Sequence, residues 1–182
     1  MARSAYKLID INRRFKILAK KDLVLDLGAA PGSWLQVARK MAGSEGFILG
    51  IDIEPVSEKL VKTPNLAFIQ KDIYDADLFD VIKRAASARK FDVVLSDAAP
   101  NTTGQKDIDE WRSHELSLRV FDVVKNETKK GGHAVVKVFE GPDTPEIIKL
   151  AKESFKEVHL VKPEASTKNS KEAYIVAKNY RK

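Results

Sequence analysis

The sequence contains no cysteine and only three histidines, at positions 114, 133 and 159. Without cysteine the chain forms no disulfide bond and offers no thiolate to a metal. The three histidines are scattered and lack the short spacing that zinc ligands show. Metal-dependent chemistry is therefore not expected.

Long apolar runs are also missing. None approaches the roughly 20 residues that span a bilayer, and the opening residues, MARSAYKLID, lack the apolar block of a signal peptide. We therefore expect a cytoplasmic protein. The 182 residues, 43% of them hydrophobic, suit one domain with a real core. We expect residues 1–182 to form a single domain and, since nothing indicates an obligate partner, a monomer.

The positive charge is concentrated at the two ends of the chain. Residues 1–22 carry seven Lys or Arg against two acids, and residues 162–182 carry six against two. The net charge is +6, so the remaining residues carry −3. Such ends are either solvated tails or a surface for phosphate backbones, and charge alone does not decide between these two interpretations.

Apolar runs alternate with helical patterns along most of the chain. Strands are expected at 23–28, 47–53, 66–71, 91–97, 133–139, 157–162 and 172–178, and helices at 4–17, 33–42, 75–88, 111–128 and 144–155. This alternation predicts an α/β fold, with a mostly parallel sheet covered by helices on both faces. The last two strands are separated only by KPEASTKNSK and should form an antiparallel hairpin at the end of the sheet. The irregular segment 98–110 follows a strand, a position where long loops are usually functional.

One predicted strand contains a charged residue that its pattern does not explain. In GGHAVVKVFEG, Lys137 interrupts a run typical of a strand covered on both faces. An unpaired ammonium would be costly there. A lysine that reaches solvent from a strand end is the structural alternative to a functional role.

The segment DLGAAPGSW follows the first strand and leads into a helix, which is where open α/β sheets bind ligands. Gly28 and Gly32 allow a close approach of the backbone to a ligand. The dinucleotide pattern G-x-G-x-x-G fails, because Ala30 and Ser33 occupy its other two positions, and no phosphate loop is present. The sequence therefore argues against a nicotinamide-dependent oxidoreductase.

Three aspartates end the next three predicted strands. Asp52 stands 24 residues after Gly28, close to where an acid binds the hydroxyls of a nucleoside ribose, and Asp72 and Asp97 follow. Each could instead cap a turn. Three carboxylates around one glycine loop suit a nucleoside that lacks a pyrophosphate and carries its own cationic centre, and S-adenosylmethionine fits that description.

Five ordered motifs carry a resemblance to a known family. SAYKL, DLGAAPGSW, SDAAPN, VVKVFEG and SKEAYIVA, spread from Ser4 to Ala177, resemble the FtsJ-type ribosomal RNA 2′-O-methyltransferases. The resemblance implies a Rossmann-like, S-adenosylmethionine-dependent methyltransferase fold, with a seven-stranded sheet whose last strand is antiparallel. It further implies a ribosomal RNA or large-subunit substrate, methylated on a uridine.

The resemblance also assigns roles to residues of this chain. The implied cofactor-binding residues are Gly32, Trp34, Asp52, Asp72 and Asp97. The implied catalytic residues are Lys7, Asp97, Lys137 and Glu172. Lys137 would be either the general base or a cation that orients the hydroxyl, because a second lysine lowers its pKa whereas two carboxylates raise it. For Lys7 and Glu172, a surface ion pair is the alternative.

The chain departs from the family pattern in two places. Ser33 stands where many members have a second glycine, and only three residues precede SAYKL, where members often have a basic arm. RNA recognition would then need either a structured ribosomal particle or compensation by the 98–110 loop and Lys106. Rival hypotheses are the same chemistry on tRNA or an mRNA cap, and a non-catalytic ribosome-assembly factor on the same scaffold. The four intact candidate catalytic residues argue against the second rival.

Overall fold

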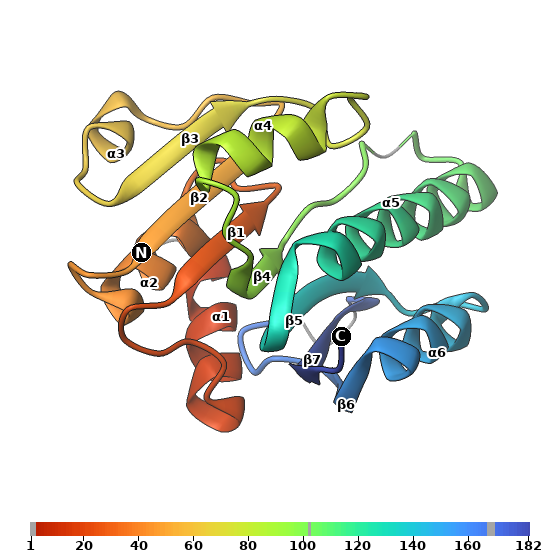
Figure 1. The fold of residues 1–182 in the computed structure, drawn as a ribbon. Helices are drawn as coiled ribbons and strands as arrows, with labels where there is room; N and C mark the ends of the chain where they lie inside the picture. Colours follow the sequence, from red (N-terminus) through yellow and green to blue (C-terminus); the bar gives the residue numbers. More distant parts are fainter. Residues whose placement is uncertain (1–2, 102, 167–169) are drawn as a thin grey trace.

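The computed structural model describes residues 3–101, 103–166 and 170–182. Seven strands form one sheet in the order β3-β2-β1-β4-β5-β7-β6 (Figure 1). The strands are β1 (Leu23–Leu27), β2 (Phe47–Asp52), β3 (Leu66–Gln70), β4 (Phe91–Ser96), β5 (Thr128–Phe139), β6 (Phe155–Val161) and β7 (Glu172–Tyr180). The helices are α1 (Arg3–Phe15), α2 (Ser33–Ala42), α3 (Glu58–Val61), α4 (Leu78–Ala85), α5 (Lys106–Glu127) and α6 (Thr144–Ser154).

The strand directions confirm the predicted fold class. The strands β1 to β5 pair in parallel, whereas β7 runs antiparallel to both of its neighbours, β5 and β6. The last two strands thus form the expected hairpin, and β7 inserts between β6 and the parallel strands. Residues 167–169 of the connecting segment lie outside the described residues.

Helices cover both faces of the sheet, and each face has its own apolar core. One core joins the sheet to α4, α5 and α6 through residues such as Ile82, Phe121 and Ile147. The other joins it to α1, α2 and α3 through Leu8 and Leu35, among others. Within the described ranges, no helix combines the length and apolar character needed to cross a membrane.

Two elements begin five residues earlier than the sequence predicts. The helix α5 starts at Lys106, not at 111, and acids at Asp107 and Asp109 favour this start because they complement the helix dipole. The strand β5 starts at Thr128, not at 133. Its first residues, TKKGG, are polar or glycine, and the pairing with β4 shifts register between Phe91 and Val93. The short helix α3 was not predicted.

Candidate active site

A pocket of about 600 Å³ opens where strands β1 to β4 end. Its lining includes Gly28, Ala30, Asp52, Asp72 and Asp97, which lie at or just after the ends of these strands. One face of α5 supplies the opposite wall. The carboxyl ends of parallel strands meet at one edge of a sheet, so residues that are far apart in the sequence gather here. The volume suits a nucleoside-sized ligand.

Two of the three strand-end aspartates in this pocket also hold the loops that surround it. The Asp52 carboxylate accepts hydrogen bonds from the N–H groups of Ala30, at 2.8 Å, and Glu54, at 2.9 Å. The Asp72 carboxylate accepts one from the N–H of Tyr74 at 2.9 Å. The turn-capping alternative therefore describes both correctly. A carboxylate has about four acceptor positions, so capacity remains for a ligand.

Gly32 and Trp34, the other two predicted cofactor residues, lie behind the lining of the pocket. Gly32 begins α2 with a φ of 103°, and a side chain there would collide with Leu60. The Trp34 indole is buried and donates a hydrogen bond to the carbonyl oxygen of Ser4 at 3.0 Å. Both residues fix the glycine loop against neighbouring helices, and their predicted contact with a cofactor stays a prediction.

Lys137 lies on the face of β5 that looks toward α1, because its neighbours Val136 and Val138 fill the opposite core. Only 9% of its side chain is exposed. Its amine donates a hydrogen bond to the backbone oxygen of Asp97 at 2.7 Å and lies 3.3 Å from Oδ1 of the same residue. The burial of this lysine near the end of its strand is thus compensated by a carboxylate that also lines the pocket.

The structure brings the four predicted catalytic residues into one chain of contacts. Lys7 of α1 forms an ion pair with Glu172 of β7. The hydroxyl of Tyr174 lies 2.9 Å from Oε1 of Glu172 and 2.8 Å from Oδ1 of Asp97, which is paired with Lys137. Lys7 and Glu172 are both largely buried, so the surface ion-pair alternative does not describe them.

Tyr174 and Ser4 complete this cluster and were not singled out from the sequence. Tyr174 lies two residues after Glu172, on the same face of β7, and directly opposite Lys137. Burial, then the charges of Asp97 and Glu172, raise the pKa of its phenol, so the hydroxyl keeps its proton. The Ser4 hydroxyl donates to Oδ2 of Asp97. The period-two pattern of EAYIV could have indicated Tyr174.

Asp26 is a third residue that the sequence analysis missed. It lies in the middle of β1, fully buried, and neither carboxylate oxygen finds a hydrogen-bond partner among the described residues. Burial, then the charges of Asp97 and Asp52, raise the pKa of this carboxyl well above its usual value. An acid inside the apolar run LVLDL is the same kind of anomaly as Lys137 and could have been noticed for that reason.

Replacing Asp26 by asparagine should stabilise the free protein at neutral and alkaline pH. The raised folded pKa means that, above about pH 4, the folded state keeps a proton that the unfolded state has lost. Wild-type stability therefore falls as pH rises from about 4 to the folded pKa, whereas asparagine does not titrate. Urea unfolding between pH 5 and 8 should show the variant gaining about 1–3 kcal/mol over wild type with rising pH. Parallel pH profiles would contradict this account.

Sheet order, glycine loop and strand-end carboxylates together define the class: this is the Rossmann-like fold of S-adenosylmethionine-dependent methyltransferases. A solved ribosomal RNA methyltransferase from Plasmodium falciparum superposes with a TM-score of 0.85 at 31% identity, covering 98% of this chain and 97% of that one. Fibrillarin from Aeropyrum pernix, solved with bound S-adenosylmethionine, shares the fold with a TM-score of 0.63 at 15% identity, over 96% of this chain and 74% of its own.

Sequence comparison narrows the class to one family. Residues 1–180 match the FtsJ-like methyltransferases. The ribosomal RNA large subunit methyltransferase E of Bdellovibrio bacteriovorus is 44% identical over 96% of this chain and 88% of its own length. The protein of the same name from Methanocaldococcus jannaschii is 38% identical, over 98% of this chain and 73% of its own length. The chain belongs to the FtsJ-like methyltransferase family, and the family predicted from five motifs is confirmed.

Proposed function

We propose that this methyltransferase transfers a methyl group from S-adenosylmethionine to the ribose 2′-hydroxyl of a uridine in large-subunit ribosomal RNA. The observation that carries the proposal is the Lys137 amine, held on Asp97 where that residue lines the 600 Å³ pocket. The relatives named as large-subunit ribosomal RNA methyltransferases support the substrate. Residues 1–182 would act as one domain, since a single sheet bears both apolar cores.

The residues around the pocket fit S-adenosylmethionine. Asp52 would accept hydrogen bonds from the ribose of the cofactor, Asp72 would lie on the adenine side and Asp97 beside the methionine portion, with Gly32 and Trp34 shaping the loop. The pocket has a carboxylate at each of these three strand ends. A cationic ligand suits such a site. When bound, the cofactor supplies an activated methyl group as a sulfonium.

Lys137 and Asp97 would then act on the acceptor hydroxyl. Displacement in line with the sulfonium needs the 2′-oxygen held at contact distance, which positioning alone can accelerate strongly. The Lys137 nitrogen donates one hydrogen bond to the backbone oxygen of Asp97 and forms an ion pair with Oδ1 of the same residue at 3.3 Å. Of its four tetrahedral positions, one carries the side chain, so at least one remains for the substrate. That position offers either a lone pair that takes the proton or an N–H that orients the oxygen. Either role needs Asp97 in place.

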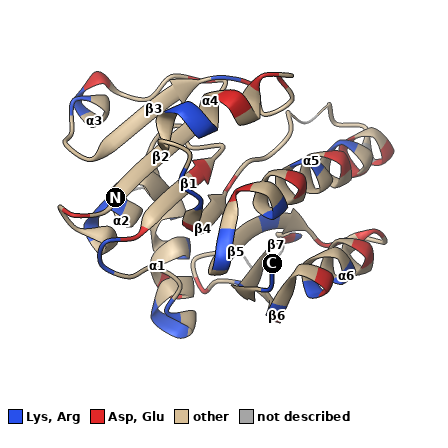
Figure 2. Cartoon of the chain, in the orientation of Figure 1, with Lys and Arg blue, Asp and Glu red and all other residues tan. Residues whose placement is uncertain are grey.

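Lys7, Glu172 and Tyr174 would position this pair from the other side. Tyr174 has one proton and two carboxylate neighbours, so it donates to one carboxylate at a time and ties β7 to the end of β4. Lys7 neutralises Glu172 and brings α1 to the site. Basic residues gather at the far end of α1 (Figure 2), including Arg13 and Arg14, so a surface for phosphates would lie on the same helix that brings Lys7 to the site.

The test is transfer of labelled methyl groups from S-adenosylmethionine to total RNA, intact ribosomes and isolated large subunits, all from cells that lack the enzyme. We expect label on a uridine 2′-oxygen of the large subunit. Label confined to tRNA would retain the chemistry and overturn the substrate. Tight cofactor binding with no label in any fraction would favour a non-catalytic assembly factor on this scaffold.

A further inference from the structure

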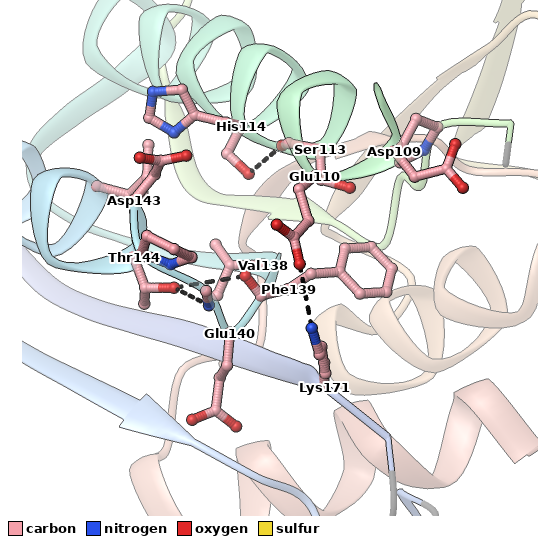
Figure 3. A pocket seen from close by; sticks show the side chains of 15 residues that line it. Asp109, Glu110, Ser113, His114, Val138, Phe139, Glu140, Asp143, Thr144 and Lys171 are labelled. Carbon is pink, nitrogen blue, oxygen red and sulfur yellow. Dashed lines mark hydrogen bonds and ion pairs between the residues drawn. The ribbon is translucent and has the colours of Figure 1, made fainter. Parts of the chain in front are cut away.

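Figure 3 shows a second cavity, of about 260 Å³, which shares one lining residue with the cofactor pocket. Pro100 lines both cavities, so the segment after β4 separates them. The rest of its wall comes from α5, the end of β5, the start of α6 and the residue before β7. Its volume is just below the smallest typical pocket for a drug-sized ligand, so it suits a single flat ring.

Helix α5 presents neighbouring faces to the two cavities. The face toward the second cavity includes Glu110, Ser113, His114 and Ser117, which have the spacing of one helical stripe, together with Asp109. The adjacent face lines the cofactor pocket with Trp111, Arg112, Glu115 and Leu116. A ligand in the second cavity would therefore lie next to the bound cofactor without overlapping it.

The charge of this cavity excludes phosphate as its ligand. Four carboxylates line it and only one basic side chain, Lys171, which forms an ion pair with Glu110 at 3.1 Å. Acidic residues appear on both α5 and α6 (Figure 2). The remaining wall is largely apolar, with Val138, Phe139 and Ile147. A neutral ring with an N–H donor matches this combination, whereas a sugar–phosphate backbone would be repelled.

The polar part of the wall has hydrogen-bonding capacity that the fold does not use. Nε2 of His114 lies 3.4 Å from a carboxylate oxygen of Glu146, and Nδ1 is buried with no partner among the described residues. Unpaired buried polar atoms cost stability and are uncommon in native proteins. This one belongs to a side chain of the cavity wall.

Phe139 connects the cavity to the site of chemistry. Its ring lies with its centroid 5.8 Å from the amine of Lys137, and it lines the cavity while remaining 39% exposed. A 2′-hydroxyl sits on the ribose carbon next to the one that bears the base. An acceptor oxygen at Lys137 therefore brings its own base to Phe139, and exposed aromatic rings stack on unpaired bases.

We propose that this cavity binds the uracil base of the acceptor nucleotide, turned out of its RNA stack, with Phe139 as the stacking surface. The inference rests on the proposed function and adds a determinant of which nucleotide is modified. Enzymes that act on a nucleotide within folded nucleic acid commonly turn it out and read its base in a pocket. Where uracil presents the donor N3–H, adenine presents the acceptor N1, so the carboxylates of the wall favour uracil.

The test compares wild type, Phe139→Ala, Phe139→Tyr and Leu160→Ala on large subunits that carry uridine or adenosine at the position labelled by wild type. Leu160 is the matched control, an apolar side chain 41% exposed on β6 that lines neither cavity. The readouts are kcat/KM for subunits, the Kd of S-adenosylmethionine and the thermal unfolding midpoint. Wild type should prefer uridine.

Phe139→Ala should lower kcat/KM on uridine subunits about 10- to 100-fold, leave the cofactor Kd unchanged and bring the uridine-over-adenosine ratio close to one. Phe139→Tyr and Leu160→Ala should behave like wild type. Equal losses on both substrates with the preference retained, or no preference in wild type, would overturn the base-binding site. No transfer by wild type to uridine subunits would instead refute the proposed function.

Discussion

Lys137→Ala should lower the rate of methyl transfer by about 10³-fold or more while leaving the affinity for S-adenosylmethionine within about two-fold of wild type. The amine is hydrogen-bonded to Asp97, next to the cofactor pocket, but does not line that pocket. Its loss should therefore impair the activation of the acceptor hydroxyl and leave cofactor binding intact. Acid–base assistance alone accounts for about 10²- to 10⁴-fold. Single-turnover methylation of large subunits measures the rate, and calorimetry measures the affinity.

Lys90→Ala provides the matched control, because Lys90 also forms an ion pair with a largely buried carboxylate, that of Glu127, 3.3 Å away. It lies before β4, at the opposite end of that strand from Asp97, and should leave the rate unchanged. Lys137→Arg separates the two roles of Lys137. Retained activity with an unaltered pH–rate profile would exclude the general base, whereas an ascending limb present in wild type and lost in Lys137→Ala would support it.

Gly28→Ala should destabilise the protein by about 2–4 kcal/mol and weaken cofactor binding at least about ten-fold. Gly28 has a φ of 72°, and a Cβ there would lie 2.6 Å from the Cα of Ala98. Two backbone segments meet at this point, so neither can relax by rotating a side chain. The segment after β4 would have to move, and with it Asp97 at the floor of the pocket.

Gly43→Ala isolates the steric part of this effect. Gly43 has the same φ of 72°, but a Cβ there would meet nothing within 4 Å. It should therefore cost only the strain of the left-handed conformation, about 1 kcal/mol, with cofactor affinity unchanged. Urea unfolding and calorimetry of both variants provide the comparison. Equal costs for the two substitutions would show that the close approach at Ala98 is unimportant.

The sequence predicts the sheet and the main site because each leaves a local signal. Strands and helices have distinct periods, and Lys137 is conspicuous inside an apolar run. Tyr174 carries a weaker signal. The period-two pattern places it on the same strand face as Glu172, but a tyrosine in a strand is ordinary until β7 is known to lie beside β5. The strand-end aspartates show a further limit of prediction from sequence. A sequence pattern presents turn capping and pocket lining as alternative roles, whereas Asp52 does both.

The second cavity could not be predicted from sequence for a different reason. It depends on how α5 is rotated against β5 and α6, and that rotation is set by tertiary packing. The stripe formed by Glu110, Ser113 and Ser117 looks like an ordinary solvated helix face. The early start of α5 at Lys106 adds the turn that carries Asp109 and Glu110, and acidic residues at a helix start are common for reasons unrelated to ligands.

The pairing of Lys7 with Glu172 determines when, during synthesis of the chain, the active-site cluster can form. These residues stand 165 positions apart, so the cluster joins the first helix of the chain to its last strand. During translation the N-terminal part emerges first, and β7 emerges after the other six strands of the sheet. The cluster around Asp97 is therefore completed only after β7 has left the ribosome. Until then, a nascent chain lacks Glu172 and Tyr174 and cannot hold its catalytic residues in their working arrangement.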